Sequence, residues 1–128
     1  MIQMGDKLYI ITRRDISPGY QAVQSCHAMR QFTHEFPVID QEWFEKSNYL
    51  ALLSVSDEET LNELYDRALS MGLRVAAFRE PDVNDSITAI AIEPCPEAQE
   101  LCKELPLALC DRRRKDAEWS LAVEEMRF

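Results

Sequence analysis

The sequence contains little glycine and proline, and it has no long apolar run. Three glycines and six prolines among 128 residues exclude a low-complexity chain, and 46% hydrophobic residues are enough for the core of one domain. No apolar run approaches the roughly 20 residues that cross a bilayer. The apolar stretch at residues 8–11 is too short for a signal peptide and is followed by charges. We therefore expect a soluble, cytoplasmic protein with no membrane partner.

The sequence also lacks the common signatures of metal and cofactor sites. Its cysteines, Cys26, Cys95, Cys102 and Cys110, show no C-x-x-C spacing and no histidine at a zinc-like interval. It contains neither a P-loop nor a G-x-G-x-x-G motif. We expect reduced thiols, no bound metal and no cofactor.

Positive charge is scarce as well. The chain has 14 Lys and Arg against 23 Asp and Glu, which gives a net charge of −9. This balance argues against broad, nonspecific binding to nucleic acid, because affinity for phosphate needs Lys and Arg. It leaves room for a local basic patch. The basic run at residues 112–115 is either a solvated helix start or an RNA contact.

Apolar runs and turn signals predict alternating strands and helices. Nearly continuous apolar runs indicate strands at residues 7–15, 48–55, 74–78 and 87–92. Helices are expected over residues 18–36, 39–46, 56–72 and 94–105. Pro37 should end the first helix, Ser56 should cap the third with Glu59 three residues later, and Gly72 should end it. Residues 79–85 are expected to form a loop.

This order of elements predicts an α/β fold. We expect a three-layer sandwich with a four-stranded mixed, mostly parallel sheet and flanking helices. The short connection between the third and fourth strands predicts one antiparallel pair, because a parallel crossover needs a dozen or more residues. Residues 1–110 should form the domain and residues 111–128 a C-terminal helical extension. Apolar residues recur at helical spacing in this extension, at Trp119, Ala122, Val123 and Met126.

The opening of the first helix, residues 17–28, is the most informative stretch. Pro18 and Gly19 supply a turn, and residues 15–19 follow the end of a strand, where sites in α/β sheets gather. Two rows of side chains then recur at helical spacing. The apolar row, expected to face the core, contains Ala22, Val23, Cys26, Met29, Phe32 and Phe36. The polar row contains Tyr20, Gln24, His27, Gln31 and His34.

Two segments resemble the type II, archaeal/eukaryotic-type peptidyl-tRNA hydrolases. That family has an apolar strand with Arg and Asp, then G-K-x-A-A-Q-x-x-H-A, and later T-V-x-x-I-G-P. The corresponding residues here are 8–15, Gly19, Ala22, Gln24, His27 and Ala28, and the later segment 88–94. The similarity covers about residues 6–109. It implies hydrolysis of the ester that joins a peptide to the 3′-terminal ribose of tRNA, and a homodimer.

The resemblance also implies which residues form the site. His27, Gln24 and Thr88 would be catalytic, together with a carboxylate from Asp82 or Glu80. Arg13, Arg14 or Arg30 would hold tRNA phosphate or stabilise charge. Tyr20 stands where the family has lysine, and residues 78–82 replace the family's D-A-G-x-T-Q segment, which supplies an aspartate.

These departures leave two hypotheses open. The first is a peptidyl-tRNA hydrolase, and the second is a catalytically silent relative that binds a partner or small ligand through the same helix face. A cysteine nucleophile is disfavoured because Cys26 and His27 are adjacent and point about 100° apart on a helix. His27 and Thr88 also have ordinary structural interpretations, as a helix–sheet contact and a strand threonine.

Overall fold

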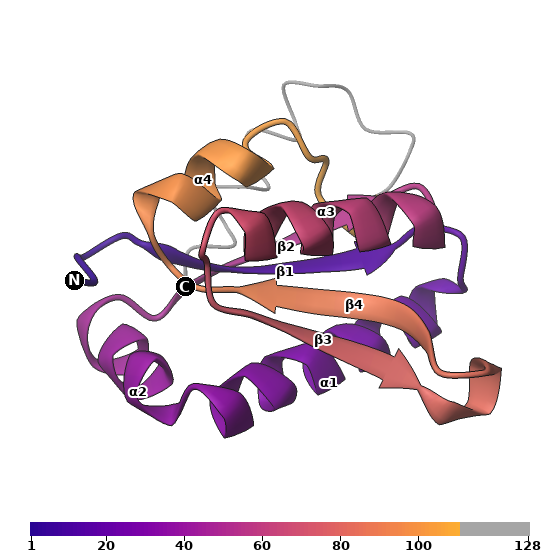
Figure 1. The fold of residues 1–128 in the computed structure, drawn as a ribbon, viewed down its shortest axis with the longest axis horizontal. Helices are drawn as coiled ribbons and strands as arrows, with labels where there is room; N and C mark the ends of the chain where they lie inside the picture. Colours follow the sequence, from indigo (N-terminus) through magenta and orange to yellow (C-terminus); the bar gives the residue numbers. More distant parts are fainter. Residues whose placement is uncertain (111–128) are drawn as a thin grey trace.

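The computed structural model describes residues 1–110, which contain one four-stranded sheet with helices on both faces (Figure 1). The basic run and the final helix predicted for residues 111–128 lie outside the described residues. The strands are β1 (Lys7–Arg13), β2 (Tyr49–Val55), β3 (Val75–Glu80) and β4 (Ser86–Ile92). The helices are α1 (Pro18–Glu35), α2 (Pro37–Lys46), α3 (Glu58–Ser70) and α4 (Pro96–Cys102), with a short 3₁₀ helix at Pro81–Val83.

The strand order is β2-β1-β4-β3. β1 pairs with β2 in parallel, and β4 lies between β1 and β3, antiparallel to both. The predicted antiparallel pair of β3 and β4 is confirmed, but the prediction of a mostly parallel sheet is wrong, because only the β1–β2 pair is parallel. The reversed strand β4 enters the middle of the sheet, so it makes two antiparallel pairs rather than one.

The three layers follow from the alternation of side chains along the strands. Leu8 and Ile10 of β1 join the core under α1 and α2, together with Ala28, Phe32 and Trp43. Tyr9 and Ile11 point to the opposite face and pack with α3 and α4. Figure 1 shows α1 and α2 on one side of the sheet and α3 and α4 on the other. This confirms the expected sandwich of helices around a mixed sheet. No helix among residues 1–110 is both long and apolar enough to cross a membrane.

The helix ends mostly follow the predicted signals. Ser17 caps α1 by accepting a hydrogen bond from the Tyr20 N–H. The helix ends at Glu35, two residues before Pro37. The predicted cap of α3 is wrong: Asp57, not Ser56, accepts the Thr60 N–H at 2.9 Å. The chain stays extended through Asp57 and turns into the helix one residue later than expected. After α3, Gly72 adopts the predicted left-handed conformation, with φ of +77°.

The face of α1 that meets the sheet is only in part the predicted apolar row: Phe32 is buried, and Met29 and Phe36 pack against the same core. Cys26 and Val23 are exposed, and the buried residues are Gln21, Gln24, Ser25, Ala28 and Phe32. Hydrogen bonds offset the cost of burying these polar side chains. Gln21 donates to the Ile16 carbonyl and Ser25 to the Gln21 carbonyl, each at 2.7 Å. The first turns of α1 are therefore attached to the domain by polar contacts, and its apolar packing begins at Ala28.

Two boundaries differ from the prediction and bear on function. β3 continues through Arg79 to Glu80, so these residues belong to a strand rather than to a loop. α4 ends at Cys102, before Leu105, and the chain then runs along β2 as an extended segment.

This segment covers the outer edge of β2. The Ser54 N–H donates to the Pro106 carbonyl and the Ala108 N–H to the Leu52 carbonyl, both at 2.9 Å. Leu107 forms a bridge with Leu53 between these two bonds. β3 forms the opposite edge of the sheet, and within residues 1–110 its strand pairing is with β4 alone.

Candidate active site

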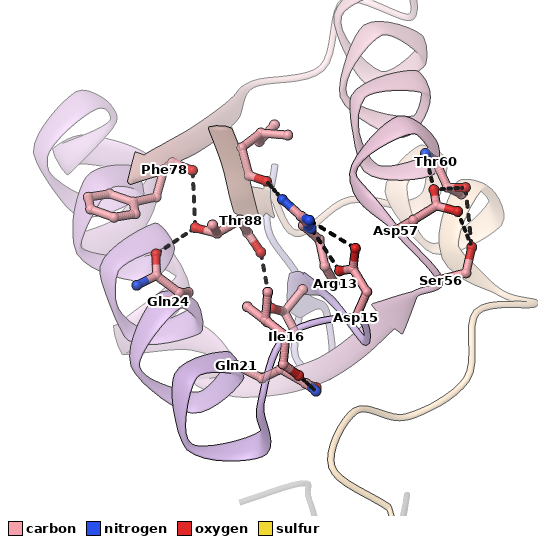
Figure 2. Close-up of polar contacts among 12 residues, drawn as sticks. Arg13, Asp15, Ile16, Gln21, Gln24, Ser56, Asp57, Thr60, Phe78 and Thr88 are labelled. Atoms are coloured by element: carbon pink, nitrogen blue, oxygen red, sulfur yellow. Dashed lines mark hydrogen bonds and ion pairs between the residues drawn. The ribbon is translucent and has the colours of Figure 1, made fainter. Parts of the chain in front are cut away.

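A β-bulge in β4 determines the direction of Thr88. Phe78 pairs with Ala89 and Arg79 with Ile87, so Thr88 is an extra residue with no opposite residue in the β3–β4 register. A bulge of this kind redirects a side chain, and here Thr88 points toward α1 (Figure 2). Its carbonyl accepts a hydrogen bond from the Thr12 hydroxyl at 3.1 Å, which ties the bulge to β1.

Three side chains form a hydrogen-bonded chain from this bulge to the edge of the sheet. The Thr88 hydroxyl donates to Gln24 Oε1 at 2.5 Å, and Gln24 Nε2 donates to Glu80 Oε1 at 2.9 Å. Thr88 is 0% exposed and Gln24 is 1% exposed, so neither is accessible to a substrate. Glu80, at the end of β3, is half-buried. The two buried residues therefore hold the Glu80 carboxylate in place through hydrogen bonds.

The surroundings of Glu80 favour its charged form. The hydrogen bond from Gln24 is the main cause that lowers the pKa of Glu80, against a smaller opposing effect of burial. The Asp82 N–H, at 3.4 Å from Oε2, and the Tyr20 hydroxyl lower this pKa further. Of the two carboxylates expected from the sequence, Glu80 meets Gln24, while Asp82 is exposed on the 3₁₀ helix and contributes its backbone N–H.

Tyr20 lies at the start of the same helix face and interacts with Glu80. Loss of solvent around the hydroxyl and the nearby Glu80 carboxylate raise the pKa of Tyr20. The hydroxyl therefore stays protonated at neutral pH and can donate a hydrogen bond. A neutral donor thus occupies the position where the resemblance leads one to expect a lysine.

His27 stacks on Phe78 of β3. The ring centroids are 4.4 Å apart and the planes are nearly parallel, at 12°. The imidazole is exposed and close enough to Glu80 to contribute to the lowered pKa of that carboxyl. The sequence reasoning missed Phe78, although it lies two residues before Glu80 and so faces the same side of the strand. His27, Glu80 and Tyr20 together present three polar groups to solvent beside α1.

The arginines named from the sequence do not join this group. Arg13 is only 13% exposed in its side chain, donates to Asp15 at 2.8 and 2.9 Å, and donates to the Ile87 carbonyl at 3.1 Å. The hydrogen bond with Asp15 raises the pKa of Arg13 and lowers that of Asp15. Arg13 thus ties the end of β1 to β4 (Figure 2).

Arg14 and Arg30 are more accessible. Arg14 donates to the Ser54 hydroxyl at 3.1 Å and lines a cavity of about 670 Å³ beside the first turn of α1. Arg30 is exposed on α1, one turn beyond His27. Within the described part of the chain, no group of three or more His, Cys, Asp or Glu side chains is arranged to hold a metal ion.

Comparison with known proteins identifies the family. A family model described as peptidyl-tRNA hydrolase PTH2 matches residues 6–107, most of the chain and all of its described helices and strands. The chain belongs to the PTH2 family. Peptidyl-tRNA hydrolase 2 of Saccharomyces cerevisiae is 28% identical to this PTH2 member over 108 residues, covering 72% of this chain and 52% of the yeast protein. The chain thus spans about half the length of that relative.

Proposed function

We propose that this PTH2 protein hydrolyses the ester between a peptide, or an N-blocked aminoacyl group, and the 3′-terminal ribose of tRNA. The observation that carries the proposal is the buried chain Thr88–Gln24–Glu80, which ends on a charged carboxylate beside His27. A buried polar network whose hydrogen bonds are satisfied is rigid, so this chain holds the Glu80 carboxylate in one position beside His27. Membership of the PTH2 family supports the same reaction.

The exposed groups suit ester hydrolysis by an activated water. Glu80 accepts a hydrogen bond from the water and orients it toward the carbonyl carbon. The water oxygen bonds to this carbon while its proton passes to the His27 imidazole, and the nearby Glu80 charge stabilises the resulting imidazolium. The bond to the ribose oxygen then breaks, and this oxygen takes the proton from His27. When substrate binds, the Tyr20 hydroxyl turns its single donor from Glu80 to the carbonyl oxygen, where negative charge develops.

Arg14 and Arg30 are the proposed contacts for tRNA phosphates. Both are exposed, and guanidinium groups bind phosphate through charge-assisted hydrogen bonds. Arg13 has a different role in this proposal, because its donors already bind Asp15 and the Ile87 carbonyl. It would support the site by holding the end of β1 next to the bulge.

The test is hydrolysis of peptidyl-tRNA by the full chain, with the yeast relative as positive control. Removal of a general base lowers the rate by about 10²–10⁴-fold, so His27→Ala and Glu80→Gln should lose activity on this scale. Asp82→Asn tests whether Asp82, rather than Glu80, supplies the carboxylate. Asp85→Asn is a matched control in the same turn, because asparagine tolerates the φ of 57° at this position. Intact peptidyl-tRNA after incubation with the wild type, while the yeast enzyme cleaves it, would reject the proposal.

One observation favours the alternative of a silent binding protein. Acidic residues, Glu80, Asp82 and Asp85, gather at the β3–β4 connection beside the neutral Tyr20, which disfavours a polyanion there. Wild-type protein that binds tRNA or a partner without cleaving peptidyl-tRNA would support this alternative. Replacement of Tyr20 by lysine should then create activity rather than reduce it.

A homodimer and a cytoplasmic location complete the proposal. The family resemblance supports the dimer, and the edge of β3 is a surface on which a second copy could extend the sheet. Light scattering coupled to size-exclusion chromatography should report twice the 14.8 kDa of one chain. Arg79→Pro, on the edge strand, should shift the protein toward monomer, because proline removes a backbone donor from β3. A monomeric wild type at micromolar concentration would contradict the dimer.

A further inference from the structure

A second pocket lies on the opposite face of the sheet from His27 and Glu80. Its floor is formed by Tyr9 of β1 and by Ala51 and Leu53 of β2, and its volume is about 370 Å³. One wall is α4, and the other is the extended segment that follows it. The wall residues are Gln99, Cys102, Lys103, Leu105, Pro106 and Leu107, and Lys7 completes the lining.

The pocket exists because α4 is short. The helix ends at Cys102, and the next residues leave the helix axis to pair with the edge of β2. Among the helices of residues 1–110, none therefore covers the sheet between α4 and this segment. Most of the lining is apolar and belongs to the core cluster of that face, so the walls are well packed from behind. A volume of this size is in the usual range for a small-molecule site, roughly 300–1,000 Å³.

The hydroxyl of Tyr9 is the main reason to expect a ligand. Tyr9 is 6% exposed, and its hydroxyl has no hydrogen-bond partner among residues 1–110. Buried tyrosines usually find a partner for this group, because leaving it unpaired costs free energy. Burial, with smaller effects of Cys102, Asp6 and Cys95, raises the pKa of Tyr9 to about 12. The group is therefore a protonated donor at the pocket, and the described residues 1–110 accept no hydrogen bond from it.

Lys7 determines which ligand charge fits. It lies two residues from Tyr9 on the same face of β1, and within residues 1–110 it forms no ion pair. Lys7 and Tyr9 line the same pocket, so one ligand can contact both side chains. The other charged side chains nearby have partners: Asp6 Oδ2 accepts a hydrogen bond from the Gln3 N–H, and Lys103 forms an ion pair with Glu100. Among the described residues that line this pocket, Lys7 is thus the available cation.

We propose that this pocket binds a small carboxylate with an apolar body, such as a medium-chain or aryl acid. The carboxylate accepts hydrogen bonds from the Tyr9 hydroxyl and the Lys7 ammonium group, and the apolar body contacts Ala51, Leu53 and Leu107. Gln99 offers a further amide donor at the rim. The site is separate from His27 and Glu80, so it does not depend on hydrolysis of peptidyl-tRNA.

The test uses the full-length protein with hexanoate as the probe and hexanamide as its neutral match. Calorimetry should show saturable 1:1 binding of hexanoate, at least tenfold tighter than that of hexanamide. Tyr9→Phe and Lys7→Gln should each weaken hexanoate binding by about fivefold or more. Tyr65→Phe removes a hydroxyl outside the pocket and should leave the affinity unchanged.

A second readout distinguishes a binding role from a structural one. Because the Tyr9 hydroxyl is buried without a partner, Tyr9→Phe should leave the melting temperature of the ligand-free protein unchanged or raise it. A variant that loses hexanoate affinity without losing stability supports the site. No saturable binding of hexanoate to the wild type would overturn the proposal. Equal affinity for hexanamide, or a lower melting temperature of Tyr9→Phe with unchanged hexanoate affinity, would do the same.

Discussion

The hydroxyl of Thr88 and the amide of Gln24 meet at 2.5 Å although 64 positions separate them in the sequence. The contact fixes which end of the Gln24 amide faces the sheet, since the hydroxyl donates and the amide oxygen accepts. Gln24 Nε2 is thereby directed at Glu80, 2.9 Å away. One buried hydroxyl on β4 thus determines the orientation of a donor on α1 and, through it, the position of a carboxylate on β3.

Replacing Thr88 by valine tests this arrangement. Valine has nearly the same shape but cannot donate, so Gln24 Oε1 would be buried without a partner. An unsatisfied buried polar group costs about 1–3 kcal/mol, and urea denaturation should report a loss on this scale. The kcat for peptidyl-tRNA should fall by about tenfold, with a smaller change in KM, since Thr88 does not touch substrate.

The matched control for this variant is Thr33→Val. Thr33 is exposed on α1 and donates only to the Met29 carbonyl of its own helix. It should keep its stability within about 0.5 kcal/mol and its activity unchanged. Equal behaviour of the two valine variants would show that the Thr88 hydroxyl does not organise the site.

Acid should affect the wild type differently from Glu80→Gln. The contacts of Glu80 lower its pKa below the ordinary 4.5 in the folded protein, so the unfolded chain binds more protons in this range. The stability that Glu80 contributes is complete above its unfolded pKa and is lost as the pH falls through the lower, folded pKa. The stability difference between wild type and Glu80→Gln should therefore be constant from pH 7 to 5 and shrink below pH 4.5. Denaturation in urea at several pH values measures it, and a difference that grows on acidification would contradict this assignment.

The stack of His27 on Phe78 should be measurable as a coupling energy. Aromatic pairs contribute about 0.5–1.5 kcal/mol beyond the area they bury, and the exposure of His27 favours the lower end. A double-mutant cycle with His27→Ala and Phe78→Leu should give a coupling in this range, measured by thermal or chemical denaturation. Phe78→Tyr keeps an aromatic ring and should retain the coupling. Additive effects of the two substitutions would mean that the rings do not support each other.

The start of α3 offers a test of the cap. Asp57→Ala removes the acceptor of the Thr60 N–H and should lower the melting temperature by roughly a few degrees. Ser56→Ala, at the position favoured by sequence alone, removes no acceptor of a backbone N–H and should change it much less. Differential scanning calorimetry of the two variants decides between them. A larger loss of melting temperature in Ser56→Ala than in Asp57→Ala would show that Ser56 caps the helix.

Much of the fold could be predicted because its signals are local. The apolar run of β1, the proline at each end of α1 and the glycine after α3 each act within a few residues, and the helices begin and end close to the expected positions. The position of β4 in the sheet could not be predicted in this way. It depends on which strands pair, a non-local property, and a single reversed strand in the middle changes two pairs at once.

The candidate site likewise has features that local sequence signals predict and features that they do not. The polar row of Tyr20, Gln24 and His27 follows from helical spacing and does form one face toward β3. The predicted apolar row was right from Met29 onward but wrong in the first turns, where hydrogen-bonded polar residues are buried in place of Val23 and Cys26. The bulge at Thr88 could not be predicted, since it is a mismatch in register between two strands and leaves no mark in either segment alone.

The segment at residues 106–108 has a consequence for how copies of the protein can associate. Endless head-to-tail stacking of sheets requires two free, complementary edges, and this segment already occupies the β2 edge. In the proposed dimer, pairing through β3 would use this edge of both copies at once. Within residues 1–110, the contacts of residues 106–108 with β2 would then hinder further growth of the sheet at its other edge.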